Sequence, residues 1–155
     1  MKVEYINPFV EGTCSVLAEL LSSPIARGKL SLITTPINTQ GVAVLIGITG
    51  DVEGRVVYDM SEQTAIKIAA VMNGEELATF NDLAKSTISE LANMITGRAI
   101  TALNNKGYNF DITPPALFSG ENMQISNLML ETLVIPLQTS CGNVIVNVAM
   151  RQRAK

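Results

Sequence analysis

A long segment with helical periodicity runs from about Asp82 to Asn105. At 100° per residue its apolar side chains fall on a single stripe, made of Ala84, Ile88, Leu91, Ile95, Ala99 and Ala102. Gly107 follows the segment, and glycine is a common residue where helices end. A helix of this length with one apolar stripe needs a broad apolar layer to pack on, and a sheet is the simplest such layer.

Strand-like patterns supply that layer. Three β-like runs are "KLSLITTPI", "GVAVLIGIT" and "EGRVVYDM", separated by residues 38–41 and 50–54, and they predict an antiparallel meander. Two further runs, "TLVIPLQT" and "NVIVNVAMR", flank the short turn "SCGN" and predict a hairpin.

Two other segments have helical spacing. Residues 7–21 predict an amphipathic helix with Asn7 as N-cap and Pro8 at the first helical position. The segment "SEQTAIKIAAVMNGEEL" predicts a helix capped by Ser61 and ended by Asn73-Gly74. The resulting order predicts an α+β fold with helices packed on one face of an antiparallel sheet. Each half joins a helix to strands, which hints at a weak internal pseudo-repeat.

Length and charge narrow the functional classes. The 155 residues contain no linker or low-complexity stretch and predict one domain over residues 1–155. A net charge of −3 argues against a nucleic-acid partner, which would require a basic face. The longest apolar run, "VAVLIGI", is far shorter than the roughly 20 residues that span a bilayer, and the first residues lack a signal-peptide pattern. We therefore expect a cytoplasmic protein with no membrane partner.

The available chemistry is also restricted. The sequence has no histidine, which excludes histidine-dependent triads and histidine-ligated zinc. Cys14 and Cys141 are the only cysteines, so we expect free thiols and no metal site. Any reaction must use carboxylates, amides or hydroxyls.

The polar side of the long helix carries Ser86, Glu90, Asn93 and Gly97. Residues three apart lie on one helix face with Cβ atoms roughly 5–6 Å apart, so Glu90 and Asn93 can contact the same object. Gly97 costs a helix about 1 kcal/mol relative to alanine, which suggests close packing or the close approach of another backbone. Spacing and composition alone nevertheless favour an ordinary solvated face.

The stretch "SELANMITGRA" resembles the active-site helix of the CheC/CheX/FliY family of bacterial chemotaxis phosphatases. The family signature is Asp or Ser, three residues, Glu, two residues, Asn, and a proline some twenty residues later. Ser86, Glu90 and Asn93 fill this signature, and Pro114 and Pro115 lie one or two positions earlier than its spacing. "GDVEGRVVYDMSEQTAIKIAAVMNGEE" and "LVIPLQTSCGNVIVNVAM" resemble the family framework, so the resemblance covers most of the chain.

Two positions depart from that pattern. Asn7, Glu11 and Cys14 repeat the spacing in the N-terminal helix, but a thiol cannot replace the paired donor and acceptor of an amide. The resemblance therefore implies a CheX-like protein with one site. Arg98 stands where a small polar residue is expected, and it could alter which partner docks.

The resemblance implies a phosphatase that stimulates hydrolysis of the aspartyl phosphate of a CheY-like response regulator. Asn93 would orient the attacking water and Glu90 would pair with the regulator's active-site lysine, with Ser86 and Gly97 supporting the contact. The protein would need no cofactor of its own, because Mg²⁺ belongs to the regulator. It further implies a homodimer. The alternative is a non-catalytic binding module for a response regulator or a flagellar or chemotaxis component.

Overall fold

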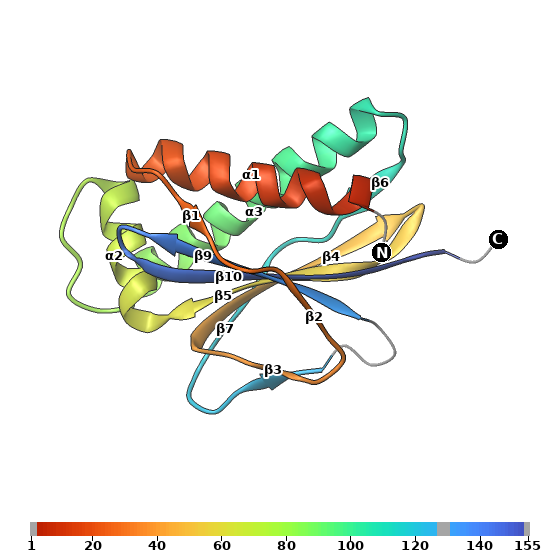
Figure 1. The fold of residues 1–155 in the computed structure, drawn as a ribbon. Helices are drawn as coiled ribbons and strands as arrows, with labels where there is room; N and C mark the ends of the chain where they lie inside the picture. The colour runs from red at the N-terminus through yellow and green to blue at the C-terminus, as the bar shows by residue number, and fades with distance from the viewer. Residues whose placement is uncertain (1–2, 127–130, 154–155) are drawn as a thin grey trace.

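Two long helices lie along one face of an antiparallel sheet, and a shorter helix packs beside them at one end of the sheet, in the computed structural model, which describes residues 3–126 and 131–153 (Figure 1). The elements in chain order are α1 (Val3–Leu21), β1 (Ala26–Arg27), β2 (Ser31–Ile33), β3 (Ile37–Asn38), β4 (Gly41–Gly50), β5 (Val52–Ser61), α2 (Glu62–Asn73), α3 (Asp82–Asn105), β6 (Phe110–Ile112), β7 (Ala116–Ser119), β8 (Gln124–Ile125), β9 (Thr132–Thr139) and β10 (Gly142–Gln152). The predicted α+β class with helices on one sheet face is confirmed.

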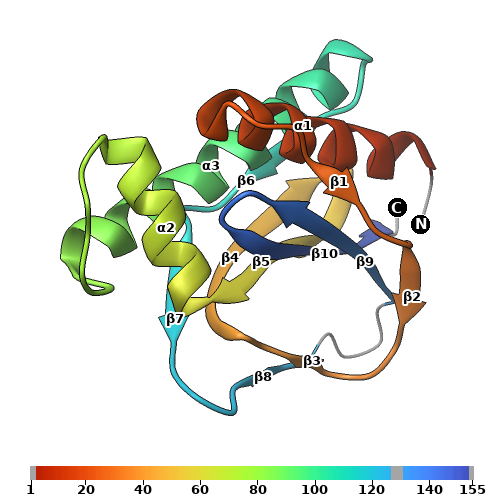
Figure 2. The same ribbon diagram turned by 60° about the vertical axis from the view of Figure 1, so that its left-hand side comes forward.

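The main sheet has eight strands, with the path β1-β9-β10-β5-β4-β6, β2 pairing with β9, and β7 pairing with β4. Strands β3 and β8 pair with each other in a separate small sheet. Alternate side chains of the central strands point toward the helices and form the core, among them Val44, Ile46, Tyr58 and Val146. Helices α1 and α3 lie side by side over this apolar face (Figures 1 and 2).

The topology contains a pseudo-repeat. The series α1, β1, β2, β3, β4, β5 matches the series α3, β6, β7, β8, β9, β10 in order, and each series ends in a hairpin. The two hairpins meet where β5 pairs with β10 at the centre of the sheet, and the matching strands β3 and β8 pair with each other. Helix α2 has no counterpart. The pseudo-repeat hinted at by the sequence is therefore present in the fold.

Two helices were predicted correctly from local sequence patterns. Ser61 caps α2 by accepting a hydrogen bond from the Thr64 amide, and Gly74 ends it in the left-handed conformation at φ 66°. Helix α3 spans the predicted residues, and its N-cap, Asn81, accepts from the Ala84 amide. The β4–β5 and β9–β10 hairpins are confirmed as well.

The prediction for the first helix was wrong at its start. Helix α1 begins at Val3, so Asn7 is not the N-cap and Pro8 lies inside the helix. The added turn buries Tyr5, whose ring packs edge-on against Tyr108 and Phe110 with centroids 5.2 and 5.4 Å away. This aromatic burial outweighs the one backbone hydrogen bond that Pro8 cannot donate.

The predicted three-stranded meander was also wrong in part. Its first run splits into β2 and β3, which pair with β9 and β8 rather than with β4. Pro36 lies between them and has no amide hydrogen to continue a ladder. The free edge of β4 is taken instead by β6 and β7, which the sequence patterns did not predict.

Candidate active site

Helix α3 is fixed at its start by α2. The Asn73 side-chain amide donates to the Ala69 carbonyl at 2.8 Å and to Thr87 Oγ1 at 2.9 Å. Thr87 Oγ1 in turn donates to the Leu83 carbonyl at 2.8 Å. These bonds join the end of α2 to the turn of α3 that precedes Glu90, so the helix cannot rotate about its axis without breaking them.

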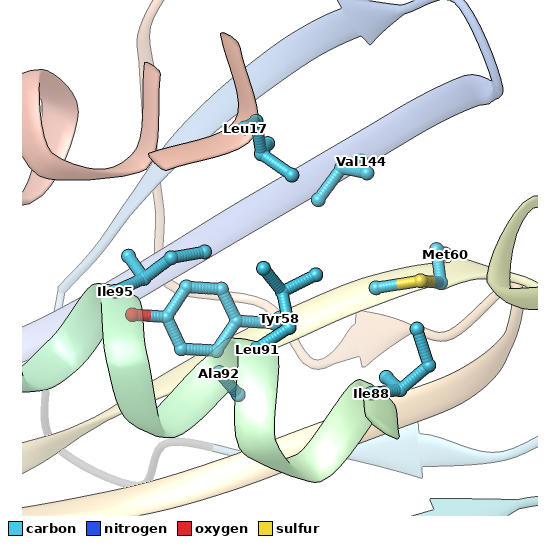
Figure 3. A pocket seen from close by; sticks show the side chains of 8 residues that line it. All are labelled: Leu17, Tyr58, Met60, Ile88, Leu91, Ala92, Ile95 and Val144. Carbon is cyan, nitrogen blue, oxygen red and sulfur yellow. The ribbon is translucent and has the colours of Figure 1, made fainter. Parts of the chain in front are cut away.

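The inner face of α3 packs tightly on the sheet (Figure 3). A residual void of about 10 Å³ lies between the helices and the central strands, lined by Leu17, Tyr58, Met60, Ile88, Leu91, Ala92, Ile95 and Val144. This volume is at the lower limit for a single water, and its lining is apolar. The space under α3 therefore holds no small-molecule substrate, and chemistry at this helix must take place on its outer face.

The outer face brings together the four residues predicted from the sequence. Ser86 and Glu90 are exposed, whereas Asn93 and Gly97 are half-buried. Within residues 3–126 and 131–153, the side chains of Glu90 and Asn93 make no hydrogen bond or ion pair. A carboxylate and an amide are thus held side by side on a rigid helix, with their polar atoms available to another molecule.

Gly97 has open space above it. A Cβ at this position would meet no atom within 4 Å apart from its immediate neighbours and the helix backbone. Of the two explanations for this glycine, close packing inside the described chain is therefore excluded. The explanation that remains is that Gly97 leaves room for the backbone of another molecule.

Arg98 reaches from α3 to the neighbouring helix α1. Its Nη1 donates to Ser15 Oγ at 3.0 Å and lies 3.5 Å from Glu19 Oε1, so the side chain bridges α3 to α1. Both charged side chains are about half exposed or more, at 46% and 67%. The arginine that departs from the family pattern is thus engaged within this chain.

Helix α1 carries three residues with the same spacing as the motif on α3, and their side chains are exposed to a similar extent. Asn7 and Glu11 are exposed and Cys14 is half-buried, which matches Ser86, Glu90 and Asn93 in turn. Burial raises the pKa of the Cys14 thiol, an effect that the nearby Arg27 charge partly opposes. A neutral thiol can neither donate nor accept as an amide does, so α1 lacks the pair found on α3.

Pro114 and Pro115 lie in the segment between β6 and β7. This segment is tied to β4 through Thr113, whose amide donates to the Gly47 carbonyl at 3.0 Å and whose Oγ1 accepts from the Gly47 amide at 2.8 Å. Pro114 is exposed and Pro115 is half-buried. The two prolines therefore directly follow a residue that is hydrogen-bonded to β4, so the start of this segment is held against the sheet.

The chemistry open to this face is limited. The described residues hold no cluster of three or more cysteine and acidic side chains that could bind a metal ion, and none of the described helices is long and apolar enough to cross a membrane. One carboxylate and one amide can pair with a cation and orient a water molecule, but they supply neither a nucleophile with its base nor a Lewis acid. The remaining parts of any hydrolytic site must come from a second molecule.

Sequence reasoning missed two residues on this face. Leu83 and Met94 belong to the exposed large apolar side chains, 42% and 38% exposed. The sequence did carry a signal for them, because residues seven before and four after Glu90 lie on the same helix face as Glu90. An apolar residue on a helix is ordinarily assigned to the core, and only the packing of α1, α2 and the sheet shows that these two face outward.

Comparison with known proteins identifies the family. The sequence profile described as "Chemotaxis phosphatase CheX" matches residues 42–138. A relative from Thermotoga maritima, named CheY-P phosphatase CheX, is 32% identical over 128 residues, which is 82% of this chain and 83% of the relative.

Solved structures of other proteins support the same family assignment. A chain in the CheX-CheY-BeF3-Mg²⁺ complex from Borrelia burgdorferi is 38% identical and superposes with a TM-score of 0.84, covering 97% of this chain and 100% of that chain. A CheC-like superfamily protein from Shewanella sp. PV-4 is 27% identical with a TM-score of 0.89, covering 97% of this chain and 99% of that chain. The profile, the relative and the shared architecture together show that the chain belongs to the CheX family of chemotaxis phosphatases.

Proposed function

We propose that this protein stimulates hydrolysis of the aspartyl phosphate on a CheY-like response regulator. The observation that carries the proposal is the pair formed by the exposed Glu90 and the half-buried Asn93, whose side chains have no partner in the described chain and are held on a rigid helix. The names of the relatives supply the substrate class, since one is called a CheY-P phosphatase and another is recorded in a complex with CheY, BeF3 and Mg²⁺.

The division of labour follows from the chemistry of phosphoryl transfer. Catalysis of this reaction is mostly positioning and charge stabilisation, with little covalent work for the helper protein. The regulator would contribute the phosphoaspartate, the Mg²⁺ and a lysine. Water oxygen attacks phosphorus, the bond from phosphorus to the aspartate oxygen breaks, and the regulator regains its free carboxylate together with inorganic phosphate.

Two side chains of this protein would complete that site. The Asn93 amide would hold the attacking water in line with the leaving oxygen, a role that an amide also fills in GTP hydrolysis. Glu90 would pair with the regulator's lysine and so fix the register in which Asn93 enters. Ser86 would support the contact at the start of the stripe, and Gly97 would leave room for the regulator's backbone.

The test is phosphate release from a phosphorylated CheY-type regulator with Mg²⁺ present. We expect wild type to accelerate release, Asn93→Ala to lose about 10²-fold in rate while still binding, and Glu90→Ala to lose both rate and affinity. Glu11→Ala is the matched control, because Glu11 occupies the same position on α1 and should leave the rate unchanged. Binding without acceleration by wild type would favour the binding-module alternative.

The remaining expectations complete the proposal. We propose that residues 1–155 act as one domain, in the cytoplasm, and as a homodimer. Leu32 on β2 is 59% exposed and lies at the β9 side of the sheet, where a second copy could cover it. A strict monomer at micromolar concentration in size-exclusion chromatography would contradict the homodimer.

A further inference from the structure

We propose that Leu83 and Met94 form an apolar clamp on the response regulator that sets its affinity, on either side of Glu90. The inference rests on the proposed function, since the regulator is the occupant of this face. The inference assigns the apolar binding contacts to Leu83 and Met94, whereas Glu90 sets the position of the bound regulator and Asn93 takes part in the chemistry. Both clamp residues are on α3 and are exposed, Leu83 at 42% and Met94 at 38%.

The three side chains form one line along the helix. Leu83 lies seven residues before Glu90 and Met94 lies four after it, so all three project within about 40° of one another around the axis. With a rise of about 1.5 Å per residue, Leu83 precedes Glu90 by about 10 Å and Met94 follows it by about 6 Å. A partner surface laid on Glu90 therefore meets an apolar group on both sides.

The pseudo-repeat shows that the fold does not require these apolar groups. When the motif on α3 is matched to the same spacing on α1, Leu83 corresponds to Glu4 and Met94 corresponds to Ser15. Glu4 and Ser15 are exposed, and α1 packs on the same sheet beside α3. The apolar pair is present only on the helix that also carries both Glu90 and Asn93.

The difference between α3 and α1 indicates what kind of molecule binds the outer face of α3. A helix that docks on another protein presents apolar anchors at helical spacing on one face, and a few buried anchors carry most of the affinity. The regulator surface around the phosphoaspartate must therefore offer apolar side chains on both sides of its cationic group.

Binding and turnover separate this inference from the proposed function. The binding assay first selects a CheY-type regulator, loaded with BeF3 and Mg²⁺, to which wild type is found to bind. This regulator is then titrated against wild type, Leu83→Ala, Met94→Ala and the double variant. We expect each single change to raise Kd roughly 5- to 10-fold. In turnover assays KM should rise while kcat at saturation stays the same, the reverse of Asn93→Ala.

Three controls keep the result clear. Val3→Ala removes an exposed apolar side chain, 64% exposed, from the far end of α1, and it should leave Kd unchanged. Met94→Leu should restore affinity, because an apolar side chain of similar volume can fill the same contact. Circular dichroism checks that each variant is folded, which we expect because both residues lie outside the core.

A Kd for the double variant equal to that of wild type would overturn the clamp. If wild type binds but does not accelerate hydrolysis, the proposed function fails, and the Kd series still decides whether Leu83 and Met94 carry the binding. If wild type hydrolyses and only kcat falls in the clamp variants, the inference fails while the proposed function stands.

Discussion

The Tyr58 hydroxyl lies 2.7 Å from Thr96 Oγ1, deep between the sheet and α3. Thr96 Oγ1 itself donates to the Ala92 carbonyl at 2.7 Å, so the proton between the two hydroxyls must come from Tyr58. Both residues are buried. The bond ties the centre of β5 to the turn of α3 that carries Asn93, and it fixes the height of that turn above the sheet.

We expect Tyr58→Phe to destabilise the fold by about 1–3 kcal/mol, because it leaves the Thr96 oxygen without its donor in a buried place. Urea denaturation measures this. Thr96→Val should cost a similar amount, and the double variant should cost less than the sum, since both polar partners are then gone. A Tyr58→Phe variant as stable as wild type would mean that the bond does not hold the helix.

Gly97→Ala should change stability and activity in opposite directions. Alanine favours a helix interior by about 1 kcal/mol over glycine, and no atom stands in the way of its Cβ, so the melting temperature should rise. If the regulator's backbone approaches Gly97, the same methyl group should raise KM. Thermal unfolding and phosphate release on one preparation test both effects. Unchanged activity would show that this room is not used.

Asp59 should make stability depend on pH. It is buried on the sheet face away from the helices, and its Oδ1 accepts a hydrogen bond from the Gln40 amide at 2.9 Å. Burial raises the pKa of this carboxyl, while hydrogen bonds from Gln40 and the Met60 amide oppose the rise.

The direction in which stability changes with pH follows from the raised pKa of Asp59. The contribution of Asp59 to stability is fully present below the unfolded value, near pH 3.9, and is lost as pH rises through the folded pKa. Asp59→Asn does not titrate, so the stability of the variant relative to wild type should increase as pH rises from about 4 through the raised pKa of Asp59. Urea denaturation at several pH values measures the gap, and a constant gap would contradict the assignment.

Arg98→Ala tests whether this residue influences docking or only joins two helices. Its ion pair with Glu19 is exposed at 3.5 Å, and such pairs are worth no more than about 1 kcal/mol. We expect a small loss of stability that disappears at high salt and no change in Kd for the BeF3-loaded regulator. A large change in Kd would show that Arg98 leaves α1 when the regulator binds.

Local signals explain which parts of the fold the sequence predicted. Ser61 and Gly74 act within one turn of the ends of α2, and α3 carries its own apolar stripe, so both helices were placed from the sequence alone. The start of α1 depends on Tyr5 meeting Tyr108 and Phe110, about a hundred residues away. Likewise β2, β3 and β6 to β8 are short strands whose partners are distant in sequence, and periodicity carries no information about such partners.

The arrangement of the candidate site residues on α3 was predicted from the sequence, whereas their roles stay predictions. Helical spacing placed Ser86, Glu90, Asn93 and Gly97 on one stripe, which the structure confirms. Spacing could not separate this pair from a chance pair on a solvated face, and the proposed roles came from the family resemblance. The outward direction of Leu83 and Met94 depends on which neighbours cover α3, and that is a property of the assembled fold.

The first helix and the last strand meet. The Gln152 side-chain amide donates to the Tyr5 hydroxyl at 3.4 Å, and residues 74–81 join α2 to α3 without taking part in either sheet. The two matching halves could therefore be exchanged along the polypeptide. A circular permutant that runs from α3 to β10 and then from α1 to α2 would retain every strand pair, while the helix with Glu90 and Asn93 would become the first part of the chain to be synthesised.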